Sequence, residues 1–157
     1  MSDKIQKVLE ILESKNLIDK RGFSITNTLI SSYIEEYAKL SGNGKKFSLR
    51  LAQKIACMNL VEFKLLHKIQ GDEGFAYVIS NPAWPDHFKV GMSKQVKKRL
   101  ASYQTYSPFR DYKLEWFGFW QDMRKGEIAL RSCFEVESHE WVLRDNIDKF
   151  KHLADIY

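Results

Sequence analysis

The sequence predicts an α+β protein: an N-terminal helical bundle followed by a small domain built on an antiparallel sheet. Up to about residue 71, apolar residues recur every three or four positions with charges between them. After Gly71, short runs rich in aromatic and β-branched residues alternate with turns that contain glycine or proline. We therefore expect a helical domain over residues 1–72 and a second domain over residues 73–157, with a three-stranded antiparallel sheet flanked by helices.

The N-terminal part predicts three helices. The second is expected to begin at a cap formed by Ser24 and to end near Gly42, and the third to run from Ser48 to Ile69. The third segment also resembles a helix-turn-helix, although Glu62 falls where that motif needs an apolar packing residue. The spacing fits either a helix-turn-helix or a plain bundle.

The C-terminal part alternates strands and helices. A hairpin is expected first, because two apolar runs flank a turn with two prolines. Ser93 is the expected cap of the next helix, and a strand rich in aromatic residues follows that helix. The expected strands are 75–79, 88–92 and 112–120, and the expected helical stretches are 94–104 and 122–137. A last amphipathic stretch covers residues 145–157.

The charge pattern favours a nucleic-acid partner. The net charge is +5 and the pI is near 9.1. Between Phe88 and Arg110 there are six basic residues and no acidic one, and tyrosines are interleaved with them. The candidate phosphate contacts are Lys45, Lys46, Arg50, Lys54, Lys64 and Lys68 in the helical half, and Lys94, Lys97, Lys98 and Arg110 in the second half.

Other classes of protein fit the sequence poorly. Cys57 and Cys133 lie far apart and the four histidines are scattered, which argues against a structural zinc site and favours buried free thiols in a reducing compartment. The N-terminus carries charge throughout, and no apolar run reaches membrane length. We therefore expect a cytoplasmic protein with no membrane partner.

Four stretches of the second half occur in an order and spacing that resemble a known family. They read GFAYVISNPAWP, FKVGM, KKRLASYQTYSPFRDYKLE and RKGE. Together they resemble the GIY-YIG nuclease superfamily, in the branch of phages and mobile elements that includes homing-endonuclease-like proteins. The resemblance covers the C-terminal half only. The residues that match the family's functional positions are Tyr77, Lys89 (in Lys-Val-Gly, where the family often has Tyr-Ile-Gly), Arg99, Tyr103 and Glu127.

The resemblance implies a sequence-directed endonuclease that cuts double-stranded DNA with one Mg²⁺ (or Mn²⁺). Glu127 would hold the ion, and the planar fork of Arg99 would bind the charged phosphate. Tyr77 would orient or deprotonate the attacking water, and as a base it would need a nearby cation to lower its pKa. Lys89 would supply local positive charge, and Tyr103 would hydrogen-bond to water or phosphate. A homodimer would suit a palindromic target.

The likeness ends beyond Glu127. Relatives commonly carry a histidine on the same helix, where this chain has Leu130-Arg131, and a Gly-Glu-Trp-Phe ending, where this chain reads SHEWV. A second interpretation is therefore a catalytically impaired fold that acts as a DNA-binding repressor. A third is an interaction module whose basic face binds an acidic protein. Taken singly, Tyr77 could be a core residue, Arg99 a solvated one, and Glu127 the partner of Lys125 or Arg131 on a helix surface.

Overall fold

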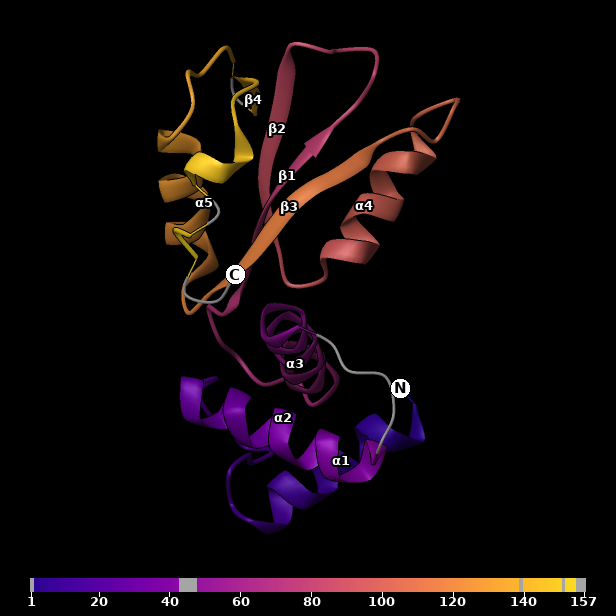
Figure 1. Cartoon of the computed structure of the whole chain (residues 1–157), viewed down its shortest axis with the longest axis vertical. Coiled ribbons are helices and arrows are strands. Elements are labelled where there is room, and N and C mark those ends of the chain that lie inside the picture. Colours follow the sequence, from indigo (N-terminus) through magenta and orange to yellow (C-terminus); the bar gives the residue numbers. More distant parts are fainter. Residues whose placement is uncertain (1, 43–47, 139, 151, 155–157) are drawn as a thin grey trace. The chain divides into compact units, whose positions relative to one another are not determined.

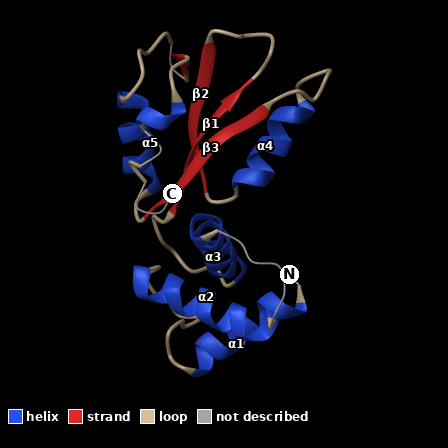
Figure 2. Ribbon diagram, in the orientation of Figure 1, coloured by secondary structure: helices blue, strands red, loops and turns tan. Residues whose placement is uncertain are grey.

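The chain forms two compact units, Met1–Gly71 and Asp72–Tyr157. The computed structural model describes residues 2–42, 48–138, 140–150 and 152–154 (Figure 1). The first unit is helical, and the second is an antiparallel sheet flanked by helices (Figure 2). The predicted α+β fold class is confirmed.

The helical unit consists of α1 (Asp3–Ser14), α2 (Asn27–Ser41) and α3 (Leu49–Leu66). The predicted cap at Ser48 is confirmed, since its hydroxyl accepts a hydrogen bond from the Leu51 amide. The predicted cap at Ser24 is wrong, because Thr26 has that role and α2 begins after it. Helix α3 has no internal turn, so its segment is not a helix-turn-helix.

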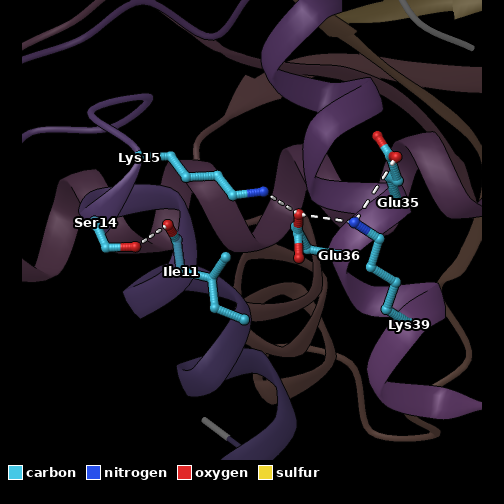
Figure 3. A network of polar contacts seen from close by, with 6 residues as sticks. All are labelled: Ile11, Ser14, Lys15, Glu35, Glu36 and Lys39. Carbon is cyan, nitrogen blue, oxygen red and sulfur yellow. Dashed lines mark hydrogen bonds and ion pairs between the residues drawn. The ribbon is translucent and has the colours of Figure 1, made fainter.

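A buried carboxylate ties the first two helices together. Glu36 of α2 is 7% exposed, and its Oε1 lies 2.6 Å from Nζ of Lys15, directly after α1. Lys39, one turn further along α2, lies 3.5 Å from the same oxygen (Figure 3). An unpaired buried carboxylate would be strongly unfavourable, so the two lysines make this buried charge tolerable.

The second unit is built on a sheet with the strand order β3-β1-β2-β4, and every neighbouring pair is antiparallel. Its strands are β1 (Gly74–Ser80), β2 (His87–Ser93), β3 (Lys113–Trp120) and β4 (Trp141–Leu143). The predicted number of three strands is wrong, because β4 pairs with the first residues of β2. A strand of three residues is too short to show the alternation that identifies strands in a sequence.

The two faces of the sheet differ. One face carries the apolar core, including Val78, Val90 and Trp116, with Leu130 of α5 (Met123–Ser132) packed into it. The other face carries Tyr77, because this residue alternates with Val78 along β1. Helix α4 (Val96–Thr105) and helix α5 lie on opposite sides of the sheet (Figure 2).

Three local predictions for this unit need correction. Ser93 ends β2 and accepts a hydrogen bond from the Gln95 amide, so α4 begins later and has no side-chain cap. Helix α5 ends at Ser132 rather than near residue 137. In the last amphipathic stretch, the described residues 145–150 and 152–154 contain one short 3₁₀ helix, η1 (Ile147–Lys149). Cys57 is buried as expected, whereas Cys133 is exposed.

Candidate active site

The centre of the site is a pair of tyrosines from different elements. The hydroxyl of Tyr77 on β1 lies 3.0 Å from the hydroxyl of Tyr103 on α4. The ring of Tyr77 passes over Gly91, its partner in the β1–β2 register. A Cβ at Gly91 would lie 2.6 Å from Cζ of Tyr77, so only glycine leaves room for the ring. The Lys-Val-Gly motif therefore shapes the site through its glycine.

The Tyr77 hydroxyl is held in its neutral form. Burial raises its pKa, and the hydrogen bond and charge of Tyr103 raise it further. The positive charge of Arg99 acts to lower the pKa, and the negative charge of Glu127 acts to raise it. The net shift is upward, opposite to the lowering that a role as general base would need. Tyr77 is thus suited to donate a hydrogen bond near neutral pH.

Arg99 and Glu127 approach the tyrosine pair from different helices. Arg99 is exposed on α4, one turn before Tyr103, so the two side chains share one face of the helix. Glu127 lies on α5, where its carboxylate accepts a hydrogen bond of 2.6 Å from Nη2 of Arg131. The same nitrogen lies 3.4 Å from the Val90 carbonyl of β2. Arg131 therefore links Glu127 to the strand that carries Gly91.

Lys89 forms an ion pair that the sequence analysis missed. Its Nζ lies 2.8 Å from Oε2 of Glu140 and 4.5 Å from the centroid of the Tyr103 ring. Burial acts to lower the pKa of Lys89, but the hydrogen bond and charge of Glu140 outweigh it and the pKa rises. Lys89 is therefore a fixed cation beside Tyr103. Glu140 lies in the stretch SHEWV, and no motif or periodicity in the sequence pairs it with Lys89.

This ion pair predicts a pH dependence of stability. The hydrogen bond from Lys89 lowers the pKa of Glu140 from 4.5, so its contribution is present above about pH 4.5 and is lost as the pH falls through the lowered pKa. Glu140→Gln should therefore reduce the free energy of unfolding at neutral pH, by less than about 1 kcal/mol because Glu140 is 60% exposed. Urea unfolding should show the two proteins converging in strongly acidic solution. A difference that does not change with pH would contradict the assignment.

The candidate DNA contacts fall into separate groups. Lys97 and Lys98 are exposed on α4, Arg110 is exposed in the following loop, and Lys94 is half-buried. In the helical unit, Arg50 and Lys68 are exposed, Lys54 is half-buried, and Lys64 is 5% exposed with its amine 4.8 Å from the centroid of the Phe23 ring. Lys64 is thus poorly placed for a phosphate. Lys45 and Lys46 lie outside the described residues.

A Mg²⁺ ion at Glu127 would need most of its ligands from outside the protein. Within the described ranges, no cluster of three or more histidine, cysteine, aspartate or glutamate side chains could hold a metal. A protein-only cage such as a zinc site is therefore not formed by these residues. Mg²⁺ in phosphate-processing sites is often held by one or two carboxylates, with waters and substrate phosphates completing its shell. Glu127 offers one such carboxylate, with its side chain 21% exposed and its Oε1 accepting a hydrogen bond from Arg131.

The described unit thus presents a tyrosine pair, an arginine and a glutamate against a four-stranded antiparallel sheet. Residues 74–146 match the family model of the T5orf172 domain, which is nuclease-like in general. The match extends from β1 through β4 and includes Tyr77, Arg99, Tyr103, Glu127 and Glu140.

No curated protein and no solved structure matches this chain. In the part of the chain that the structure describes, no helix is long and apolar enough to cross a membrane.

Proposed function

We propose that the second unit is a GIY-YIG-type endonuclease that hydrolyses a phosphodiester bond of double-stranded DNA with one Mg²⁺ or Mn²⁺. The observation that carries the proposal is the Tyr77 hydroxyl, which pairs with Tyr103 and feels the charges of Arg99 and Glu127. The match of residues 74–146 to a nuclease-like domain supports the same conclusion.

Each residue of the site has a role in this proposal. Arg99 binds the phosphate through its planar fork, and Lys89 adds a cation that Glu140 holds in place. Tyr77 donates a hydrogen bond from its hydroxyl to a phosphate oxygen, and Tyr103 orients that hydroxyl. Glu127 holds the metal ion, which when bound neutralises charge that develops on the phosphate.

The helical unit would then help to hold and orient the protein on DNA. Its exposed basic residues include Arg50 at the start of α3 and Lys68 just after it. Contacts of this kind with phosphates position a protein on DNA without reading bases. The proposal therefore assigns the helical unit affinity and orientation.

One observation favours a second function, DNA binding without cleavage. The Arg131 guanidinium already neutralises Glu127 at 2.6 Å, so the carboxylate has a partner in the protein itself. A repressor that evolved from a nuclease would keep the basic surface and use Glu127 as a structural residue. Such a protein would bind DNA tightly and in a salt-sensitive way.

A plasmid cleavage assay tests the proposed function. Because the target sequence is unknown, the substrate is a plasmid library with a randomised insert, incubated with Mg²⁺, Mn²⁺ or EDTA. We expect metal-dependent nicking or cutting of some library members. Arg99→Ala should lower the rate by on the order of a hundredfold or more, as expected when a donor to transition-state charge is lost.

The matched control for Arg99 is Lys113→Ala, which also removes an exposed positive charge but lies on the outer strand β3. This variant should cut at the rate of the unchanged protein. Protein that binds its preferred duplex in the presence of metal, yet leaves it intact over long incubation, would contradict the proposed function and support the repressor.

A further inference from the structure

The loop between α4 and β3 carries two aromatic side chains that are exposed to solvent. Tyr106 is 87% exposed and Phe109 is 83% exposed, with Pro108 between them and Arg110 directly after. Figure 1 shows this loop standing out beyond the end of α4. Burying a large ring is strongly favourable, so two exposed rings within one short loop are a candidate contact surface.

The rings are exposed, but hydrogen bonds fix the loop itself. The Gln104 side chain donates to the Tyr112 carbonyl at 2.7 Å and accepts from the Tyr112 amide at 2.9 Å. Within the loop, the Ser107 hydroxyl lies 2.8 Å from Asp111, which also accepts a hydrogen bond from the Asn81 side chain. An ordered loop that presents two rings loses little conformational entropy when it binds a partner.

The loop is joined to the candidate active site at both ends. Tyr103, whose hydroxyl meets Tyr77, lies one helical turn before Tyr106. Tyr112, at the far end of the loop, packs its ring 5.6 Å from that of Tyr103, measured between centroids. A long molecule whose phosphate lies at Tyr77 and Arg99 could therefore extend along α4 toward the exposed rings.

The charge around the loop identifies the class of partner. From Phe88 to Arg110 the chain has six basic residues and no acidic one, and Lys97 and Lys98 are exposed on the helix that leads into the loop. This surface suits a polyanion and would repel an ordinary basic protein. A polyanion that also offers flat apolar faces to aromatic rings is a nucleic acid.

We propose that the loop at residues 106–110 is a wedge that places Tyr106 and Phe109 between or against the bases of DNA next to the phosphate bound at Arg99. Side chains of this kind unstack a base step and kink the duplex. The inference rests on the proposed function, because it takes DNA as the substrate of the neighbouring site. It adds that the DNA is deformed where it is bound.

The test measures base unstacking with metal absent, so that cleavage does not enter. A duplex is selected from a random pool by binding, and 2-aminopurine is placed at successive positions along it. Its fluorescence rises where a base is unstacked, and anisotropy of an end label gives the affinity. The variants are Tyr106→Ala/Phe109→Ala, Tyr106→Trp/Phe109→Trp and, as a control, Val136→Ala, which shortens another exposed apolar side chain.

We expect full-length protein to raise the fluorescence at one step of the duplex. The double alanine variant should lose this rise and weaken binding by roughly tenfold or more, because it loses two stacked rings. Its melting temperature and the salt dependence of its affinity should stay the same, since the rings are exposed and carry no charge. The double tryptophan variant should keep the rise, and Val136→Ala should behave as the unchanged protein.

The proposal is overturned if the double alanine variant binds and unstacks the duplex as before, or if it changes self-association while DNA binding is unaltered. Protein that selects no duplex at all overturns it as well. A different result contradicts the nuclease proposal alone: the two rings are needed for unstacking, but the DNA is not cleaved with Mg²⁺ or with Mn²⁺. If the protein cleaves DNA but unstacks no base, the nuclease proposal is supported and the wedge proposal is contradicted.

Discussion

Glu127→Gln is expected to lower the rate of DNA cleavage about a thousandfold or more, because metal-ion stabilisation in such sites is worth several kcal/mol. Glutamine keeps the size of the side chain but removes the charge that holds a divalent cation. DNA binding without metal should be equal or tighter, since a negative charge is removed close to the phosphate. The measurement compares single-turnover cleavage rates with affinities from anisotropy in EDTA.

Arg131→Gln provides the matched control for this prediction. Both variants break the ion pair between Glu127 and Arg131, but only Glu127→Gln removes the carboxylate. In the proposed function, Arg131→Gln frees Glu127 from a competing cation, so half-maximal cleavage should need less Mg²⁺. If Glu127 is only a structural partner of Arg131, the two variants should instead lose activity or stability to the same extent.

The larger features of the fold could be predicted because they depend on long segments. The strands β1 and β3 are rich in aromatic and β-branched residues, and α1 has a regular apolar stripe. The missed strand β4 has only three residues, and its pairing with β2 depends on tertiary contacts. The expected extension of α5 toward residue 137 is wrong because Phe134 leaves the helix and packs in the core beside Phe150.

The site could be predicted in its residue types but not in its pairings. The order of the motifs predicts Tyr77, Arg99 and Glu127 as site residues, and in the structure the charges of Arg99 and Glu127 act on the pKa of Tyr77. The contact between Lys89 and Glu140 joins residues far apart in the chain, and no sequence periodicity encodes it. The direction of the Tyr77 pKa shift depends on burial, which a short motif does not specify.

Gly91→Ala is expected to destabilise the second unit and to reduce cleavage by the molecules that remain folded. The added methyl group would lie 2.6 Å from Cζ and 3.0 Å from Cε2 of Tyr77, whose ring is buried and cannot swing into solvent. Overpacking of this kind costs about 1–3 kcal/mol. Replacing glycine by alanine in a strand otherwise gains about 0.4–1 kcal/mol, so the steric term decides the sign.

The effect on cleavage follows from the same clash. To admit the methyl group, the Tyr77 ring must move, and its hydroxyl then loses the 3.0 Å contact with Tyr103. Gly118→Ala is the matched control, because its added methyl group would lie 2.8 Å from Cη2 of Trp116 on the opposite face of the sheet. Both variants should unfold at lower urea concentration, but only Gly91→Ala should cut more slowly at a temperature where both are folded.

A double-mutant cycle separates the clash from any other effect of alanine at position 91. Tyr77→Ala removes the ring that the new methyl group would strike, so Gly91→Ala should cost far less in that background than in the original chain. Residues in direct contact typically show interaction energies of about 0.5–3 kcal/mol in such cycles. Additive losses in the free energy of unfolding would mean that the ring does not press on Gly91, and the role of Lys-Val-Gly in shaping the site would have to be abandoned. A coupled result would tie the glycine of the second motif to the tyrosine of the first through a single steric contact.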